Sequence, residues 1–286
     1  MHAAVVTSFD APPSYVEHPD PRAHGDGEVV VEVLAAGLHP RVRSQADGSH
    51  YTTTGELPLV PGIDGVVRDP KGRIRYTVLD DTRLGTMAER TVIDLDRSVV
   101  LPNGIDPVQV AAAMNPAMSS WVALRRRIAK RFGAGRVVAA GRDTGRLAGL
   151  RALGADATCT FDELARAADV DVVIDYVWGE PTARAMVDLL GARTDRSAPL
   201  TWIEVGSVAG PEAAVPSAAL RSARLQLVGI GIGSVPGRDF VKEPPRLASA
   251  VADGAFDVRA RAVPLAEVEQ AWTATAGLAD RIVFVP

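Results

Sequence analysis

Residues 124–157, "LRRRIAKRFGAGRVVAAGRDTGRLAGLRALGADA", decide the fold, because they read as half of a nucleotide-binding unit. The short apolar run at 136–141 predicts a β-strand. The pattern after it predicts a helix that Asp143 or Thr144 can cap and that stops at Gly154. A strand that leads into a capped helix is typical of the parallel α/β folds that bind dinucleotides.

The other half of such a unit is a glycine loop, which normally lies between a strand and a helix with the spacing G-x-G-x-x-G/A. Gly133 and Gly135 do not continue this spacing, and they precede a strand rather than a helix. Gly229 and Gly231 lie within an extended apolar run. Both pairs are better explained by turns and close strand packing, so the sequence shows no phosphate-binding loop.

Strands and helices alternate through the rest of this half of the chain. The patterns predict strands at 169–177, 200–206 and 225–233, helices at 181–191, 244–254 and 265–277, and a final strand at 281–285. The first of these strands is continuously apolar at its centre, which fits a parallel strand that is covered on both faces. The alternation predicts a doubly wound α/β sheet with right-handed crossovers.

A helical region precedes this alternation. Asp106 and Pro107 form a helix start, with a capping carboxylate followed by proline at the first helical position. Because the residue before a proline disfavours the α conformation, we expect an interruption at Asn115–Pro116. A second helix is then expected from Pro116 to about Arg131.

The first hundred residues predict a different kind of domain. Short β-prone runs at 3–9, 28–37, 73–79 and 88–95 are separated by stretches rich in proline, glycine and aspartate. This half is expected to form a small, irregular β domain.

Composition excludes several classes of function. The formal net charge of −4 predicts no bulk attraction to nucleic acid or to an anionic membrane, and no run of 18 apolar residues suggests a membrane span. The N-terminus lacks the pattern of a secretory signal. Cys159 is the single cysteine, so we expect no disulfide within the chain and interpret this residue as a small buried hydrophobe. A cytoplasmic setting fits these features.

Several segments together resemble one known family. They are "LAAGLHPRVRSQADG" (34–48), "LPLVPGIDGVV" (57–67), "RFGAGRVVAAGRDTGRLAGLRALGAD" (131–156), "DVVIDYVWG" (171–179) and "PLAEVEQAW…RIVFVP" (264–286). In this order they resemble the medium-chain dehydrogenase/reductase superfamily, in its zinc-independent quinone oxidoreductase (zeta-crystallin-like) branch. The resemblance implies a GroES-like catalytic β domain, at 1–115 and 256–286, and a doubly wound Rossmann-type domain at 116–255.

The chain departs from the family pattern at one place. Family members carry a strand, a glycine loop and a helix where this sequence passes directly through Ala129–Lys130. The Rossmann-type sheet is therefore expected to be incomplete, without its first βα unit. Because unpaired buried backbone groups are costly, we expect the strand at 136–140 to close toward the strand at 171–176.

The resemblance also bears on zinc. Zinc-dependent relatives have a cysteine near position 38 and a Gly-His-Glu triplet where this chain has Gly62, Ile63 and Asp64. Leucine and isoleucine cannot bind zinc, and Leu38 and Ile63 occupy those positions. His39 and Asp64 remain, but two ligands do not make a catalytic zinc site. No metal site is predicted.

By resemblance, the activity is NADPH-dependent reduction of a quinone or an α,β-unsaturated carbonyl. Arg142 follows the strand at 136–141, where an arginine accommodates the 2′-phosphate of NADP, and this favours NADPH over NADH. The residues assigned to the cofactor are Gly141, Arg142, Asp175, Val177, Val205, Gly206 and Ser207.

The proton donor stays open in the sequence. Tyr51 is the first candidate, followed by His39 or His50, and solvent can also protonate the product oxygen.

Two further expectations concern partners. Residues 225–234 are expected to form the last strand of the sheet, and such an edge can pair with a second copy to give a homodimer. The alternative function is that of a catalytically silent relative, an interaction or scaffold protein, because the phosphate-binding loop is absent.

Overall fold

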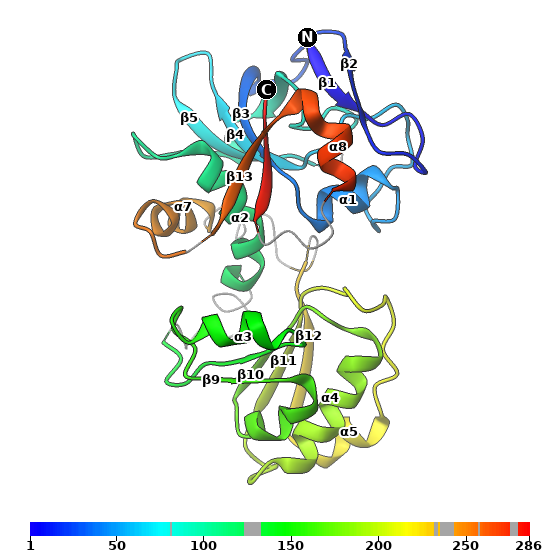
Figure 1. The fold of residues 1–286 in the computed structure, drawn as a ribbon, viewed down its shortest axis with the longest axis vertical. Coiled ribbons are helices and arrows are strands. Elements are labelled where there is room, and N and C mark those ends of the chain that lie inside the picture. Colours follow the sequence, from blue (N-terminus) through cyan, green and yellow to red (C-terminus); the bar gives the residue numbers. More distant parts are fainter. Residues whose placement is uncertain (81, 123–132, 232–233, 235–242, 257, 275–279) are drawn as a thin grey trace. The chain divides into compact units, whose positions relative to one another are not determined.

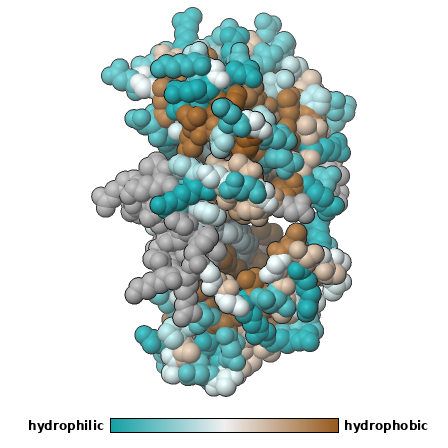
Figure 2. Space-filling model, turned by 90° about the vertical axis from the view of Figure 1, so that its left-hand side faces the viewer, coloured by the Kyte–Doolittle hydropathy of each residue, from teal (hydrophilic) through white to brown (hydrophobic). Residues whose placement is uncertain are grey.

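The computed structural model describes residues 1–80, 82–122, 133–231, 234, 243–256, 258–274 and 280–286. The chain divides into two compact units. Unit 1 consists of Met1–Met118 and Val241–Pro286, and unit 2 consists of Ser119–Phe240. Figure 2 shows apolar residues, in brown, reaching the surface of each unit among hydrophilic ones.

The elements are distributed over the two units as follows. In unit 1 they are β1 (His2–Val5), β2 (Ser14–Glu17), β3 (Glu28–Gly37), α1 (Pro40–Ala46), β4 (Asp64–Arg68), β5 (Ile74–Val78), β6 (Arg90–Asp94), η1 (Leu95–Arg97), β7 (Ser98–Val100), most of α2 (Pro107–Val122), α7 (Pro244–Ala252), β13 (Ala260–Pro264), η4 (Leu265–Glu267), α8 (Val268–Thr273) and β14 (Arg281–Val285). In unit 2 they are β8 (Val138–Ala140), α3 (Thr144–Leu150), β9 (Ala157–Cys159), η3 (Phe161–Ala167), β10 (Val172–Asp175), α4 (Gly179–Ala192), β11 (Leu200–Glu204), α5 (Ser217–Ser222) and β12 (Leu225–Gly229).

Unit 1 is built on one continuous sheet. Among the described residues its strand order is β13-β14-β3-β4-β5-β7, and β6 also pairs with β3. In the middle of the long strand β3, from Val31 to Ala35, buried residues alternate with more exposed ones, as expected for a strand with one face on the core. Its last residues pair with the C-terminal strand, since Gly37 lies opposite Val283 and Ala36 opposite Phe284.

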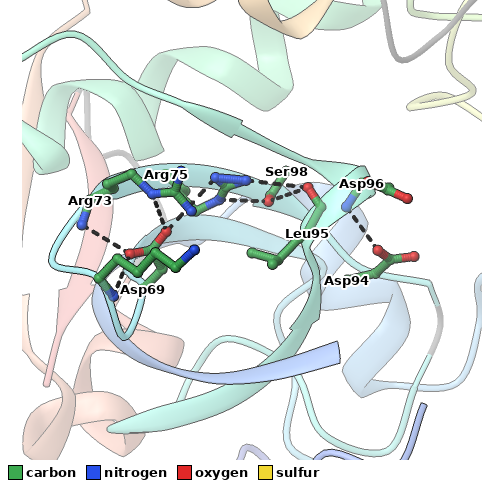
Figure 3. Close-up of polar contacts among 8 residues, drawn as sticks. Asp69, Arg73, Arg75, Asp94, Leu95, Asp96 and Ser98 are labelled. Atoms are coloured by element: carbon green, nitrogen blue, oxygen red, sulfur yellow. Dashed lines mark hydrogen bonds and ion pairs between the residues drawn. The ribbon is translucent and has the colours of Figure 1, made fainter. Parts of the chain in front are cut away.

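The turn between β4 and β5 is held by one buried carboxylate (Figure 3). Asp69 Oδ1 accepts hydrogen bonds from the backbone N–H groups of Lys71 (2.9 Å) and Arg73 (3.0 Å). Its Oδ2 accepts one from Arg73 Nε (2.8 Å). Gly72 adopts a φ of 78°, a conformation that favours glycine. These contacts explain why the stretch "DPKGR" forms a turn.

Helix α2 runs without a break through Pro116, so the interruption expected at Asn115–Pro116 is wrong. Proline fits the helical φ and mainly removes one backbone hydrogen bond. Val110, Met114, Met118 and Val122 are spaced four residues apart and all are buried. Burial of this stripe offsets the loss at the proline. The expected helix beyond residue 122 lies outside the described residues.

Unit 2 contains a parallel three-stranded sheet in the order β10-β11-β12. Met186, Leu189 and Leu190 of α4 pack with Ala219 of α5 against Leu200 and Trp202 of β11. Figure 1 shows α4 and α5 on one side of these strands. The strand ranges predicted from the sequence contain these three strands.

Strands β8 and β9 form a separate two-stranded parallel sheet. The expectation that 136–140 closes toward 171–176 is therefore wrong, because β8 pairs with β9 and β10 pairs with β11 but β8 does not pair with β10. A cavity of about 230 Å³ is lined by both, with Val138 and Ala140 on one side and Val172 and Ile174 on the other.

Two smaller expectations can be compared with the structure. Cys159 is a buried free thiol at the end of β9, as predicted, and burial raises its pKa. Over the described ranges, no helix has the length and apolar character that a membrane span requires.

Candidate functional site

The end of β8 places Arg142 at the surface. Its neighbour Asp143 caps α3, since its Oδ1 accepts a hydrogen bond from the Arg146 backbone N–H at 3.0 Å, as the sequence predicted. The same carboxylate lies 3.3 Å from Arg146 Nε. Asp143 is thus engaged within α3. Within the described part of the chain, the Arg142 guanidinium is exposed and has no ion pair, so it is available to an anion.

Asp175, at the end of β10, is buried and accepts hydrogen bonds at both oxygens. Oδ1 accepts from the backbone N–H groups of Val177 (2.8 Å) and Trp178 (3.2 Å). Oδ2 accepts from Thr182 Oγ1 (2.6 Å) and Trp202 Nε1 (3.0 Å). Because four protein donors surround this carboxylate, it fixes the loop after β10 and the start of α4. It leaves no oxygen directed at a cofactor.

The loops that follow β10 and β11 are bonded to each other. The backbone N–H groups of Val205 and Gly206 donate to the Asp175 carbonyl at 2.8 and 3.3 Å, and that of Ala209 donates to the Val177 carbonyl at 2.8 Å. Ser207 is exposed between them. The structure therefore brings five of the expected cofactor residues together, at the carboxyl ends of adjacent parallel strands, where α/β folds bind ligands.

Two features at this edge were not expected from the sequence. Tyr176 is partly exposed, and its hydroxyl bonds to Ser119 Oγ at 2.9 Å and also to Ser120 Oγ. Glu204 lies opposite Asp175 in the register, and burial together with that carboxylate raises the pKa of Glu204.

In unit 1, His39 forms a buried pair with Asp64. His39 Nε2 lies 2.8 Å from Asp64 Oδ1, and the exposed fractions of the side chains are 5% and 0%. Tyr76 donates its hydroxyl hydrogen to Asp64 Oδ2 at 2.8 Å. Burial, and then the Asp64 carboxylate, raise the pKa of Tyr76 well above its ordinary value. Tyr76 and Asp64 thus form a fixed base for the imidazole ring.

The second ring nitrogen of His39, Nδ1, is buried and has no hydrogen-bond partner among the described residues. Pro40 follows at the first position of α1 and fixes the backbone at this point. A buried imidazole nitrogen without a partner is unusual, because most buried polar atoms are satisfied. It is the atom of this triad whose hydrogen-bonding position is unused among the described residues.

The other expected proton donor, Tyr51, has a different environment. Its side chain is 73% exposed, and its ring lies against that of His50 with a centroid distance of 4.2 Å. His50 Nδ1 hydrogen bonds to Thr52 Oγ1 at 2.8 Å. An exposed phenol is less constrained in position than the buried histidine.

The positions at which zinc-dependent relatives carry ligands are buried here in apolar packing. Leu38 and Ile63 belong to the core of unit 1. Gly62 has a φ of 113°, and a Cβ there would lie 2.4 Å from Thr86 Oγ1, so glycine is required. Among the residues described, no three His, Cys, Asp or Glu side chains form a group that could hold a metal ion.

Sequence reasoning missed the contacts that give these residues their environment. It named His39 and Asp64 separately, but nothing in the spacing indicated that Tyr76 completes the triad. The strand pairing of β4 with β5, which places Tyr76 opposite Val66, supplies that contact. The contacts of Trp202 and Thr182 with Asp175 could likewise not be predicted from the sequence, because they depend on the packing of the strands and α4.

Comparisons with known proteins cover the whole chain. No family model matches it. The probable NADPH-dependent quinone reductase tdiC of Emericella nidulans is 27% identical over 362 aligned positions, with 100% of both chains covered. This alignment is longer than the 286 residues of the present chain, so the relative carries stretches that have no counterpart here.

Solved structures share the fold. The quinone oxidoreductase of Thermus thermophilus, whose crystal structures include a complex with NADPH, matches with a TM-score of 0.83 at 24% identity over 100% of both chains. A thermostable alcohol dehydrogenase from Pyrobaculum aerophilum matches with a TM-score of 0.78 at 20% identity, over 100% of this chain and 99% of the other. The chain shares the fold of these proteins, in which a GroES-like domain is joined to a Rossmann-type domain.

Proposed function

We propose that this chain reduces a quinone or an α,β-unsaturated carbonyl with NADPH, by hydride transfer and without zinc. The observation that carries this proposal is the full-length match to a curated quinone reductase that depends on NADPH. The alternative, a silent scaffold, has no support in the comparisons. Unit 1 is proposed as the catalytic domain and unit 2 as the nucleotide-binding domain.

The residues of unit 2 fit the cofactor in part. NADPH supplies the hydride, and the protein contributes binding and orientation. Arg142 is exposed and free to form a bidentate contact with the 2′-phosphate. The described residues contain no glycine loop between a strand and a helix for the pyrophosphate. We therefore expect weak binding overall, with the preference for NADPH retained.

Titration of both cofactors tests this assignment. Wild type should bind NADPH about ten- to a hundredfold more tightly than NADH, because a charge-assisted hydrogen bond contributes about 1.5–3 kcal/mol. Arg142→Ala should remove that ratio. Arg146→Ala is the matched control, since Arg146 is also exposed but is engaged with Asp143. Equal affinities in wild type, or an unchanged ratio in Arg142→Ala, would contradict the role of Arg142.

In unit 1, His39 is proposed to supply the proton that the reduced product takes up. The protonated imidazole gives up the hydrogen on Nδ1 and keeps the one on Nε2, which is bonded to Asp64. Asp64, itself fixed by Tyr76, holds the ring in place. Tyr51 is the alternative proton donor. Solvent is the third source of the proton, and it requires no donor residue.

Steady-state kinetics separates these donors. If His39 is the donor, His39→Gln lowers kcat and alters its pH profile while KM for the quinone changes little, whereas Tyr51→Phe leaves kcat unchanged. A purely structural role of His39 would instead lower the melting temperature without changing the pH profile of the active fraction. Unchanged kcat in both variants would indicate protonation by solvent.

Zinc independence rests on Leu38 and Ile63, which bury alkyl groups at the positions of two zinc ligands in relatives. Dialysis against a chelator is expected to leave the rate of NADPH oxidation by 1,4-naphthoquinone unchanged. A loss of activity that zinc restores would contradict this. No quinone-dependent oxidation in the untreated protein, with NADPH bound, would instead contradict the enzymatic proposal itself.

The proposal extends to assembly and surroundings. β12 is the last strand of its sheet, and among the described residues it pairs only with β11. Pairing of two such edges across a twofold axis would give a homodimer. Sedimentation at micromolar concentration tests this, and a monomer would contradict it. A cytoplasmic setting, with neither a membrane nor a nucleic-acid partner, completes the proposal and agrees with the net charge of −4.

A further inference from the structure

The two sheets of unit 2 present facing edges of free backbone. In a parallel pair, alternate residues direct both N–H and C=O toward the same neighbour. The Gly141 N–H donates to the Cys159 carbonyl, and the Ala157 N–H donates to the Val137 carbonyl, so residues 137, 139 and 141 face β9. Val138 and Ala140 therefore direct their backbone groups away from β9.

The same argument applies to β10. The Thr201 N–H donates to the Asp171 carbonyl, and the Val205 N–H donates to the Asp175 carbonyl, so 171, 173 and 175 face β11. Val172 and Ile174 direct their backbone groups to the opposite side. Within the described part of the chain, no strand pairs with this edge of β10 or with the free edge of β8.

These two edges border the same cavity. Val138, Ala140, Val172 and Ile174 all line the space of about 230 Å³. One water needs about 10–15 Å³ of such space, so the cavity is larger than the site of a single solvent molecule. Val173 and Asp175, which face β11, also line the cavity, so all four residues of β10 border it.

The other residues that line the cavity determine which kind of ligand it can bind. Phe161 and Leu164 of η3, together with Ala185 and Leu189 of α4, give one side an apolar surface. Among the described residues of the lining, Asp175 is the only charged one, and its oxygens already accept four hydrogen bonds from the protein. A charged ligand therefore has no counter-charge here. A small apolar ligand would leave both rows of backbone groups unsatisfied.

We propose that the gap between β8 and β10 binds one extended segment of another polypeptide chain, as a parallel strand with apolar residues at alternate positions. The occupant supplies backbone donors and acceptors on both of its sides, and its apolar side chains lie on η3 and α4. Strand addition of this kind is a recurring mode of peptide recognition. The site lies within unit 2 alone and borders Asp175 and Val177, which are assigned to the cofactor.

The first experiment uses a labelled peptide, KTVTVTVK, and the full-length protein. Saturable binding is expected, together with slower amide exchange at Val138, Ala140, Val172 and Ile174. The amides of Ala139 and Val173 serve as internal controls, since they already face β9 and β11. Binding without added protection at the four edge amides would overturn the proposal, as would no binding.

The second experiment separates a strand from an apolar filling. The same peptide with N-methyl groups on its three valines keeps its side chains but loses donors along one side. Its affinity should fall by at least about tenfold, because each backbone hydrogen bond contributes a factor of about five to ten. Equal affinity of the two peptides would show that the gap accepts apolar groups only, and would overturn the strand assignment.

A blocking variant completes the test. Ala140→Trp places an indole in the gap and should abolish peptide binding. Ala148→Trp is the matched control, because Ala148 is an exposed alanine on α3 outside the cavity. Retained binding in Ala140→Trp would contradict the site. If protection of the edge amides rises with protein concentration in the absence of peptide, the bound strand comes from a second copy of this chain. That result would overturn the proposal that a different protein supplies the strand.

Discussion

The two units differ in the continuity of their β-sheets. In unit 1, β14 joins β3, and among the described strands all but the separate pair of β1 and β2 form one sheet. In unit 2 the order is broken between β8 and β10, and a cavity lies at the break. The comparison shows that helices packed on a sheet can preserve the positions of parallel strands even where backbone pairing is lost.

The largest expected effect lies in the continuous sheet. Phe284 of β14 is fully buried, so Phe284→Ala removes a large side chain from a closed core. We expect a loss of about 3–5 kcal/mol in the free energy of unfolding of unit 1. Urea denaturation, followed by amide exchange in peptides from unit 1, measures it. A loss below about 1 kcal/mol would show that this sheet is as loosely held as that of unit 2.

A smaller loss is expected from the carboxylate that ties the broken sheet to its loops. Asp175→Asn keeps the shape of the side chain but removes its charge. If the new NH₂ group takes the place of Oδ2, the hydrogen bonds from Thr182 and Trp202 are lost, and if the amide oxygen takes it, they are weaker. We expect a loss of about 1–3 kcal/mol, confined to unit 2. Faster amide exchange in β10 and β11 with no change in β3 is the expected pattern. Equal changes in both units would contradict independent behaviour of the two sheets.

Enlarging one alanine in each sheet gives the sharpest contrast. Ala36 is 1% exposed and lies in the core opposite Phe284, so Ala36→Leu should cost about 1–3 kcal/mol through overpacking. Ala140 borders the cavity, and Ala140→Leu should cost nothing measurable, because the space already exists. Thermal unfolding of both variants provides the comparison. A comparable loss in Ala140→Leu would mean that the cavity closes in solution.

The smallest effects are opposite in their dependence on pH. Burial raises the pKa of Asp69, but hydrogen bonds from Arg73 and Lys71 outweigh it and hold this pKa below 3.8. The contribution of Asp69 to stability is therefore present above pH 3.8 and is lost as the pH falls further. Burial and Asp175 raise the pKa of Glu204 above 4.5, so its contribution is present below pH 4.5 and is lost as the pH rises.

Two variants test these signs, each against wild type. Asp69→Asn should reduce the acid-induced loss of amide protection in the β4–β5 turn, while Glu204→Gln should remove a loss of stability of unit 2 as the pH rises above 4.5. Each effect is expected to stay below about 1 kcal/mol. The same pH slope in variant and wild type would contradict the corresponding assignment.

Local patterns predicted most of the elements. Asp143 was expected as a cap and is one, and the apolar runs at 172–175, 200–204 and 281–285 are strands. These features depend on residues that are close together along the chain, so they can be predicted from local sequence patterns. The continuous helix through Pro116 could not be predicted, because its stability depends on what its buried stripe packs against.

The site was predictable only as a list of positions. The bonds of Asp175 with Trp202, and of Asp64 with Tyr76, join residues whose distance in space depends on strand register. The cavity between β8 and β10 was also hidden, because the cost of unpaired backbone predicted closure. The packing of helices against each part of the sheet competes with the cost of unpaired backbone groups. The free energy of this packing cannot be inferred from local sequence patterns.

The pairing of β14 with β3 has a consequence for the order of events during synthesis. In unit 2 every paired strand joins the next one in the chain, from β8 with β9 to β11 with β12, so these contacts can form as the chain emerges. In unit 1 the end of β3 lacks this partner until residues 281–285 have been translated. A growing chain therefore exposes an open, apolar strand edge while all the residues between the two strands are added. We expect this nascent edge, rather than the broken sheet of unit 2, to be the place where chaperones bind and where misassembly begins.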